Sequence, residues 1–390
     1  MSPARGSAEP IRVVIAPDSF KGSIGAASAA SALAEGWRSV RPDDEILLKP
    51  MADGGEGTLD AFDASVAGAE RIPVTVSGPD DVMSDASWLL LPPTPEAPAG
   101  TGVIDLASTS GIELLGGHLR AWDAHTLGFG QAMRAALGYG VSRLVLGIGS
   151  SASTDGGMGA LTALGARFMD AAGDPCAPGA RGLTRLASVE LSDLVPLPEA
   201  GVIVLSDVPN PLVGPTGAAA VFGPQKGLDP GCAEVVDAGL ARLATLLGVD
   251  PASPGAGAAG GTGMALIAWG AQLLPGAAQV AEVIGLSNAV ASATVVITGE
   301  GSYDGQSAAG KVPAFIVRLA AESGAATVLV AGRIAPDADL APFAIAESLS
   351  RVAGSPAEAQ RHAEHWLVEA GRRTALAFEH RPTSAMQTSA

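Results

Sequence analysis

The run Arg143-Leu144-Val145-Leu146-Gly147-Ile148, followed by Gly149-Ser150-Ser151-Ala152-Ser153-Thr154-Asp155-Gly156-Gly157-Met158-Gly159, decides the fold that we expect. The first run is short, apolar and β-prone, and residues 160–164 after the loop are typical of a helix. A buried strand that opens into glycine and hydroxyl residues and then begins a helix directs backbone N–H groups and the positive helix end at one point, which favours anion binding. Asp155 is the unusual member, because an anion-binding turn does not need a carboxylate.

The same strand, loop and helix pattern recurs along the chain. Strands are predicted at residues 11–16, 46–49, 143–148, 202–205, 294–297 and 327–330. Helices are predicted at residues 26–40, 59–66, 127–137, 160–164, 230–247, 312–322 and 356–375. This alternation favours an α/β fold with a parallel sheet that binds its ligands at the carboxyl ends of the strands.

A change of pattern near residue 68 indicates a second domain. Residues 72–76, 86–91 and 103–107 are predicted as short strands with few helices between them. We therefore predict two α/β domains. The first is a discontinuous parallel-sheet domain of the Rossmann or flavodoxin type (residues 10–67 and 290–378), the second is a mixed α/β domain inserted at residues 68–289, and residues 1–9 and 380–390 are flexible tails.

Composition excludes several classes of function. The 390 residues are 47% hydrophobic, which is enough for a sizeable core, and the net charge of −17 repels nucleic-acid backbones and anionic lipid. Cys176 and Cys232 have no zinc-site or disulfide spacing, and residues 1–10 lack the apolar core of a signal peptide. The apolar stretch at 263–286 is interrupted by polar residues and a proline, which argues against a membrane span. We expect a cytoplasmic protein, monomeric or homodimeric, with no nucleic-acid or membrane partner.

Four loops that follow predicted strands combine a carboxylate with glycine, proline or hydroxyl residues. Their carboxylates are Asp53 and Glu56, Asp155, Asp207, and Glu300 with Asp304. Each loop alone is weak evidence, because Asp and Gly are ordinary turn residues. Together, at the strand ends of an α/β protein, they suit Mg²⁺, which uses one or two carboxylates plus substrate phosphates.

Three lysines lie in comparable loops: Lys21, Lys226 and Lys311. In so acidic a chain they are candidates to neutralise a phosphate or a substrate carboxylate. The run Gly305-Gln306-Ser307-Ala308-Ala309-Gly310-Lys311 matches the first seven positions of a P-loop, but Val312 occupies the position of the Mg²⁺-binding Ser or Thr. A phosphate contact by Lys311 is therefore expected without a true P-loop.

Other enzyme classes lack their motifs. The first strand opens into Asp18-Ser19-Phe20-Lys21 where a dinucleotide-binding loop needs glycines, and no GxSxG elbow occurs. His125, beside Thr126 and ahead of a predicted helix, is a candidate substrate contact. Glycine loops, carboxylates for a metal and lysines that balance charge point to phosphoryl transfer, which relies on positioning and electrostatics.

Long ordered motifs carry a resemblance to a known family. They are residues 15–23, 50–58, 146–157, 206–212, 222–227, 255–261 and 298–307. Over about residues 11 to 375 the chain resembles the bacterial type I glycerate kinases. The resemblance implies two α/β domains with the active site in the cleft between them. It also implies ATP- and Mg²⁺-dependent phosphorylation of D-glycerate, usually to 2-phosphoglycerate.

The resemblance also supplies expected roles. Asp155 is the candidate base, Asp207 and Asp304 hold Mg²⁺ or orient the acceptor, and Lys21 and Lys226 balance phosphate or carboxylate charge. The residues expected to bind substrate or nucleotide are Asp18, Ser19, Asp53, Gly54, Gly55, Glu56, Ser150, Ser151, Asn210, Lys226, Gly260, Gly261, Glu300 and Lys311.

The chain departs from the family's pattern at several positions. Thr154 stands in an asparagine position, Ser206 in a cysteine position, and Ser302 where the family has the arginine of Gly-Glu-Gly-Arg. The loss of that arginine keeps open a kinase that acts on another small hydroxy acid. A non-catalytic ligand-binding homologue, and the choice between the 2- and the 3-phosphate product, also stay open.

Overall fold

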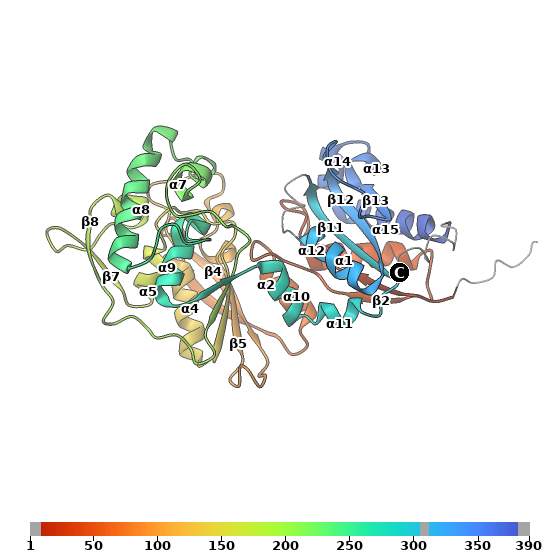
Figure 1. The fold of residues 1–390 in the computed structure, drawn as a ribbon, viewed down its shortest axis with the longest axis horizontal. Coiled ribbons are helices and arrows are strands. Elements are labelled where there is room, and N and C mark those ends of the chain that lie inside the picture. Colours follow the sequence, from red (N-terminus) through yellow and green to blue (C-terminus); the bar gives the residue numbers. More distant parts are fainter. Residues whose placement is uncertain (1–8, 305–311, 381–390) are drawn as a thin grey trace, which may run out of the picture. The chain divides into compact units, whose positions relative to one another are not determined.

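The computed structural model describes residues 9–304 and 312–380, which form two units, each with its own sheet and core (Figure 1). Unit 1 contains the chain up to Ala52, Asp60–Ser65, and the chain from Val280 onward. Unit 2 contains Asp53–Leu59 and Val66–Gln279. The chain therefore leaves the first sheet, builds a second one, and returns.

Unit 1 is built on a parallel five-stranded sheet in the order β13-β12-β11-β1-β2. Its strands are β1 (Arg12–Ile15), β2 (Glu45–Leu48), β11 (Val295–Tyr303), β12 (Ala326–Ile334) and β13 (Ile345–Ser348). As predicted, C-terminal strands return to the sheet that the N-terminal strands begin, because Val13 to Ile15 pair with Val295 to Ile297.

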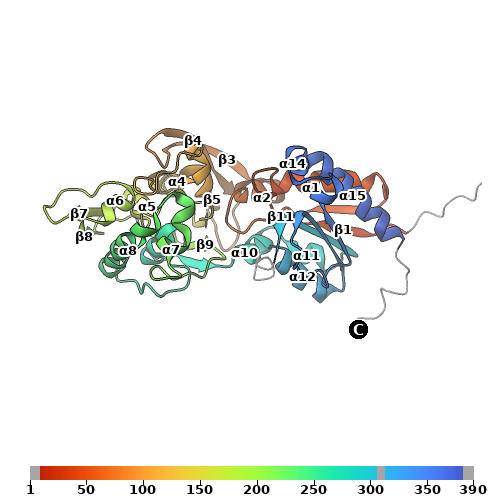
Figure 2. The same ribbon diagram turned by 90° about the horizontal axis from the view of Figure 1, so that it is seen from above.

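Helices cover both faces of this sheet. Most of its helical residues lie in α1 (Ala26–Arg38), α2 (Thr58–Ser65), α11 (Leu286–Val290), α12 (Val312–Ser323), α13 (Leu349–Val352), α14 (Pro356–Arg361) and α15 (Ala363–Glu379). Figure 2 shows α1, α14 and α15 on one side of β1 and β11, and α11 and α12 on the other. α1 and α15 pack so closely that a Cβ on Gly36 would lie 1.9 Å from the backbone oxygen of Val368.

Unit 2 has a mixed six-stranded sheet in the order β10-β9-β6-β5-β4-β3. Its strands are β3 (Glu70–Ser77), β4 (Met83–Leu91), β5 (Thr101–Asp105), β6 (Arg143–Gly147), β9 (Val202–Leu205) and β10 (Gln272–Leu274). β5, β6, β9 and β10 run parallel, whereas β3 and β4 are antiparallel additions at one edge. The predicted mixed α/β architecture is therefore present.

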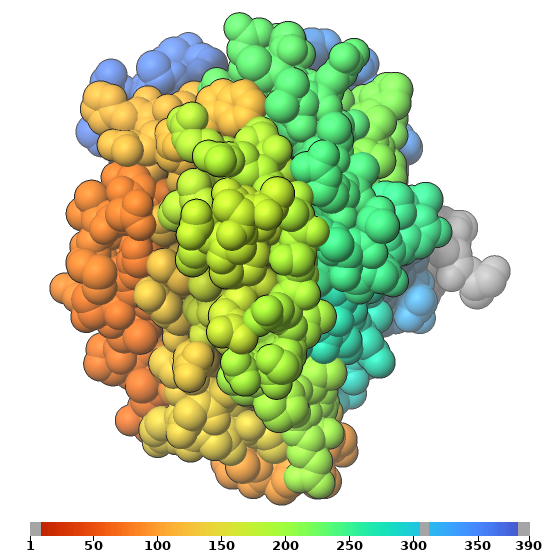
Figure 3. Space-filling model, turned by 90° about the vertical axis from the view of Figure 1, so that its left-hand side faces the viewer, coloured from red at the N-terminus to blue at the C-terminus, as the bar shows by residue number. Residues whose placement is uncertain are grey.

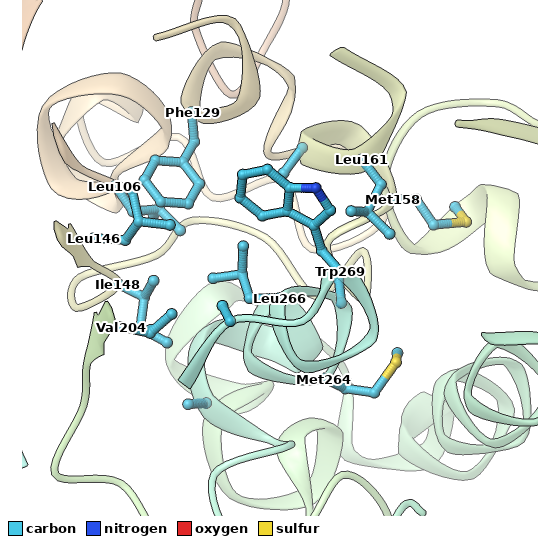
Figure 4. Close-up of a cluster of buried hydrophobic side chains, with 14 of the residues drawn as sticks. Leu106, Phe129, Leu146, Ile148, Met158, Leu161, Val204, Met264, Leu266 and Trp269 are labelled. Carbon is cyan, nitrogen blue, oxygen red and sulfur yellow. The ribbon is translucent and has the colours of Figure 1, made fainter. Parts of the chain in front are cut away.

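The helices of unit 2 pack a large apolar core against this sheet. They are α3 (Ala107–Ser110), α4 (Leu127–Tyr139), α5 (Met158–Ala163), α6 (Gly179–Leu183), α7 (Ala218–Phe222), α8 (Ala233–Leu247), α9 (Thr262–Trp269) and α10 (Gly276–Val283). The last residues of α10 belong to unit 1. Short 3₁₀ turns lie at Ile112–Leu115, Pro224–Lys226, Pro230–Cys232 and Ala258–Gly261. Figure 4 shows Phe129 of α4 beside Leu146 of β6, and Trp269 of α9 in the same buried cluster. These buried side chains anchor the ends of the parallel strands from which the loops of the site emerge.

A small antiparallel sheet, β7 (Arg167–Asp170) with β8 (Leu186–Glu190), extends unit 2 beside α8. Arg242 of α8 donates a hydrogen bond to the backbone oxygen of Leu186. Figure 3 shows this face, with the yellow-green chain around β7 and β8 next to the green of α8.

The observed elements differ from the predicted ones in several places. β11 continues to Tyr303, so most of the predicted loop at 298–305 is strand, because Glu300 and Ser302 pair with β12. The predicted helix at 356–375 is two helices, since His362 leaves helical geometry with φ −123°. β7, β8, β10 and β13 were not predicted; each is only three to five residues long.

The unit boundaries also differ from the predicted domains in three segments, the shortest of which is residues 66–67, assigned to unit 2. Asp53–Leu59 belongs to unit 2, because Gly54 and Gly55 pack against Gly147 and Gly149. Residues 280–289 belong to unit 1. The predicted tails fall almost wholly outside the described residues.

In the described parts of the chain, no helix has the length and apolar character that a membrane span requires.

Two glycines of α4 allow a matched test of how closely α4 and α5 must pack. A Cβ on Gly130 would lie 2.4 Å from the backbone oxygen of Ala160, whereas a Cβ on Gly138 would meet nothing within 4 Å. We expect Gly130→Ala to lower the free energy of unfolding by about 1–3 kcal/mol through overpacking. Gly138→Ala should raise it by up to about 1 kcal/mol. Urea denaturation measures both, and equal effects would contradict the close packing.

Candidate active site

Glycine loops meet at the carboxyl ends of the parallel strands of unit 2. The loop at 53–55 lies across β6 and β9: the backbone N–H of Gly149 donates to the oxygen of Gly54 at 2.9 Å, and a Cβ on Gly54 would lie 2.4 Å from the oxygen of Leu205. A Cβ on Gly149 would lie 2.5 Å from the Cα of Gly55. These positions require glycine because two backbones touch there.

The loop at 255–261 packs onto the same layer. The N–H of Gly156 donates to the oxygen of Gly260 at 3.0 Å, and the N–H of Gly257 donates to the oxygen of Asn210 at 3.0 Å. Gly260 has φ +67°, and a Cβ there would lie 2.1 Å from the oxygen of Ser153. The loops at 53–55, 149–157, 206–211 and 255–261 thus form one contiguous layer of backbone in unit 2.

Lys226 is buried inside this layer, with 2% of its surface exposed. Its Nζ donates hydrogen bonds to Ser151 Oγ at 2.6 Å and to the backbone oxygen of Ser153. Burial lowers the pKa of Lys226 to about 7, against the attraction of the Asp155 carboxylate. Since Ser151 Oγ accepts from Lys226, its own hydroxyl hydrogen is left to donate to a ligand.

Asp155 is fully buried and saturated with hydrogen bonds. Its Oδ2 accepts from the N–H and hydroxyl of Thr126 at 2.9 and 2.8 Å, and from the N–H of Gly159 at 3.2 Å. Its Oδ1 accepts from Ser153 Oγ at 3.2 Å and from the N–H of Gly157 at 3.0 Å. The carboxylate joins the start of α4, the loop and the start of α5.

This environment does not suit the base that we expected at Asp155. A general base needs an oxygen that reaches the proton it abstracts. Both oxygens of Asp155 already face donors of the chain, and 0% of the residue is exposed. Asp155 fits the role of a buried anion that holds the loop. Thr126, which was not among the predicted site residues, donates two of its hydrogen bonds.

Asp207, at the end of β9, fits an active carboxylate better. Its Oδ1 accepts from the N–H of Gly276 at 3.0 Å, while its Oδ2 is buried without a hydrogen-bond partner. Burial raises the pKa of Asp207 to about 6, the Gly276 hydrogen bond opposes this shift, and the nearby charge of Asp53 adds to it. Raised carboxyl pKa values of this kind are typical of functional sites.

Other predicted residues occupy the same layer with less direct evidence of a role. Ser150 is half-buried and has φ +57°, a strained value for a serine. Asn210 uses its amide to donate to the oxygen of Thr216 at 2.8 Å, and Glu56 is exposed. Thr154, in the family's asparagine position, is buried and its hydroxyl has no hydrogen-bond partner.

His125 is not placed as a free substrate contact. Its Nε2 lies 3.0 Å from Asp81 Oδ1, and its Nδ1 accepts from the N–H of Leu127 at 3.3 Å. With 1% of the residue exposed, both ring nitrogens serve the entry to α4. His125 therefore holds the start of α4, and Thr126 connects this start to Asp155.

The remaining predicted residues lie in unit 1, at the ends of β1 and β11. The N–H of Asp18 donates to the oxygen of Gly299 at 2.8 Å, and the N–H of Ser19 donates to Asp18 Oδ1 at 2.6 Å. Glu300 is buried within β11, and Lys21 is exposed. Asp304 is half-buried, whereas Lys311 lies outside the described residues.

Among residues 9–304 and 312–380, no group of three or more His, Cys, Asp or Glu side chains is arranged to hold a metal ion. In unit 2, Asp53 and Asp207 lie close enough for the charge of Asp53 to raise the pKa of Asp207. Two carboxylates suffice for Mg²⁺ when phosphate oxygens and water complete its shell.

Comparison with known proteins identifies the family. The sequence profile of the glycerate kinase family matches residues 13–379. The chain belongs to the glycerate kinase family. It is 39% identical to glycerate 2-kinase of Escherichia coli over 335 residues (84% of this chain and 86% of that protein), and 37% identical to glycerate kinase of Bacillus subtilis over 337 residues (84% and 87%).

A solved structure extends this similarity to the fold. A crystal structure described as that of a glycerate kinase 2 from Salmonella typhimurium LT2 has a TM-score of 0.79 and 35% identity, and the match covers 95% of this chain and 99% of that one. The predicted family, the α/β fold class and the classification as a kinase are therefore confirmed.

The buried carboxylate of Asp155 predicts a stability effect. Asp155→Asn turns an amide NH₂ toward backbone and hydroxyl donors, so we expect the free energy of unfolding to fall by roughly 2–4 kcal/mol. Glu199→Gln, which neutralises an exposed carboxylate of the same unit, is the control and should change it by less than about 0.5 kcal/mol. An Asp155→Asn protein as stable as wild type would contradict the structural role.

The buried lysine predicts a pH effect with a defined sign. Unfolded Lys226 keeps its proton up to the ordinary pKa of 10.5, whereas folded Lys226 loses it above about 7. Rising pH between these values therefore stabilises the folded state, by at most about 1.4 kcal/mol per pH unit. We expect the free energies of unfolding of wild type and Lys226→Met, measured from denaturation curves, to diverge as the pH rises through this range.

The control for this measurement is Lys21→Met, which removes an exposed lysine. Its unfolding free energy should parallel that of wild type from pH 7 to 10. Parallel curves for Lys226→Met as well would mean that the folded lysine keeps its proton.

Proposed function

We propose that this protein transfers the γ-phosphoryl group of ATP to D-glycerate and forms 2-phosphoglycerate. The observation that carries the proposal is the family match over residues 13–379, together with relatives named glycerate 2-kinase and glycerate kinase. A cytoplasmic monomer or homodimer is part of the same proposal, on the grounds of composition.

Asp207 is the residue that we assign to the acceptor hydroxyl. Its buried Oδ2 has no hydrogen-bond partner and is free to accept one from the hydroxyl of glycerate. As the oxygen–phosphorus bond forms, the hydroxyl proton passes to this carboxylate. We assign Asp207 to proton transfer in place of Mg²⁺ binding, because its other oxygen already accepts from Gly276.

The layer around Lys226 supplies electrostatic stabilisation for anionic ligands. Ser151 is held by Lys226, and its hydroxyl hydrogen is available to an anionic oxygen. The protonated lysine lies directly behind this hydroxyl, so it strengthens the hydroxyl as a donor without reaching the ligand itself. Glycines at 54, 55, 260 and 261 keep the backbone of the layer uncovered by side chains.

Asp53 is the carboxylate that fits Mg²⁺. It is half-buried, and its charge helps to raise the pKa of Asp207, so a divalent cation on Asp53 would relieve this repulsion. When bound, Mg²⁺ would neutralise negative charge on the phosphoryl group. Asp304, the other predicted ligand, stays a prediction.

A second candidate is a kinase for another small hydroxy acid. Thr154 and Ser302 replace an asparagine and an arginine of the family pattern, and the Thr154 hydroxyl is buried without a partner. Such a change in hydrogen-bonding groups alters substrate choice more than fold.

One assay separates these functions. Coupled measurement of ADP release with D-glycerate and a panel of small hydroxy acids, with ATP and Mg²⁺, identifies the substrate, and phosphorus NMR identifies the phosphorylated hydroxyl. Turnover with D-glycerate and a 2-phosphate product is the expected result. Binding of D-glycerate or ATP without turnover would indicate a non-catalytic homologue.

A pair of aspartates tests the role of Asp207. We expect Asp207→Asn to lower kcat by about 10²–10⁴-fold, because the amide cannot take the proton. Asp237→Asn is the matched control: Asp237 also accepts from a glycine N–H, that of Gly214, and also has one buried oxygen without a partner, but it lies on α8. Equal kcat losses in both variants would refute the assignment.

A further inference from the structure

The parallel sheet of unit 1 contains a topological switch point between β1 and β11. Along the chain β1 is followed by β2 on one side, whereas β11 is followed by β12 on the other. In open parallel sheets the loops at such a point diverge, and ligands bind at the carboxyl ends of the two strands. This edge is formed by residues 17–21 after β1 and by the last residues of β11.

Backbone contacts bring a third strand to the same edge. A Cβ on Gly301 would lie 3.2 Å from the backbone nitrogen of Lys21, and a Cβ on Gly332 would lie 2.4 Å from the oxygen of Gly301. Ser302 and Arg333 are register partners on β11 and β12, so their side chains share one face of the sheet. Arg333 Nη2 donates a hydrogen bond to Ser302 Oγ at 3.3 Å.

Both cations at this edge are exposed, and among the described residues neither forms an ion pair with a carboxylate. The Lys21 side chain makes no hydrogen bond or ion pair with any residue in the described ranges, and the bond found there for the Arg333 guanidinium goes to the neutral hydroxyl of Ser302. By contrast Arg12, Arg41 and Arg181 are each paired with a carboxylate. In a chain of net charge −17, two cations without an ion-pair partner among the described residues leave guanidinium and ammonium donors for a ligand.

We infer that Ser302 and Arg333 form an oxyanion-binding site of unit 1, in which Arg333 supplies from β12 the guanidinium that the resembled family carries at the position of Ser302. Ser302 Oγ accepts from Arg333, so its hydroxyl hydrogen points to the ligand together with the remaining guanidinium donors. Planar guanidinium groups bind carboxylate and phosphate in the same forked geometry. The ligand is therefore an oxyanion, either the carboxylate of the hydroxy acid or a phosphate of the nucleotide.

This inference rests on the proposed function, and steady-state kinetics with Arg333→Gln tests it. We expect the KM of one substrate to rise about 10-fold or more, as for a lost hydrogen bond to a charged group, with kcat within about 2-fold. A rise for D-glycerate identifies the carboxylate, and a rise for ATP identifies the phosphate. The control Arg318→Gln removes an exposed arginine of α12 and should leave both KM values unchanged.

Relocation of the guanidinium sharpens the test. In the double variant Ser302→Arg with Arg333→Ser, the guanidinium moves to the register partner, and we expect the affected KM to return to within about 3-fold of wild type. Unchanged KM values in Arg333→Gln, or a double variant no better than Arg333→Ser alone, would overturn the inference.

Calorimetric binding of inorganic phosphate, ADP and D-glycerate, each alone, separates this outcome from failure of the proposed function. Wild type that binds one of these anions more tightly than Arg333→Gln, with the difference shrinking at high salt, supports the site even if D-glycerate is not turned over. Equal binding of all three anions by the two proteins counts against the site even if the kinase reaction is confirmed.

Discussion

The structure of unit 2 depends on one buried carboxylate. A charged group that is removed from water must recover its hydrogen bonds from the chain. Asp155 does so with five donors taken from Thr126, Ser153, Gly157 and Gly159. Because these donors come from the start of α4, the loop after β6 and the start of α5, the carboxylate determines where these three segments meet.

Close backbone contact is the second constraint, and it places the charged groups of the site. Glycine loops that touch backbone to backbone bury Lys226 and partly bury Asp207, and burial shifts both pKa values toward the neutral form. Because burial favours the neutral forms of Lys226 and Asp207, an anionic ligand near the lysine or a cation near the aspartate can restore their charges. This is the electrostatic state that phosphoryl transfer exploits, since its catalysis is positioning and charge stabilisation.

Sequence reasoning found the loops of the site, and the role of Asp155 as a base stays a prediction that its five buried hydrogen bonds do not favour. The position of Asp155 after a strand identified it as important, yet the same residue type serves as base or as buried anchor. Thr126, which donates two of the hydrogen bonds to Asp155, lies 29 residues away in the sequence. Glu300 and Ser302 were expected in a loop, but pairing with β12 extends β11 through them. Contacts between distant segments are absent from local patterns.

By itself the sequence determined the alternation of strands and helices, the chain's return to its first sheet, and the loops that follow strand ends. These are consequences of local periodicity and turn chemistry, which neighbouring residues specify. Tertiary structure alone decided which donors form hydrogen bonds to the Asp155 carboxylate, how deeply Lys226 is buried, and that Arg333 lies beside Ser302. Each of these depends on register and packing between elements far apart in the chain, and only the folded protein contains that information.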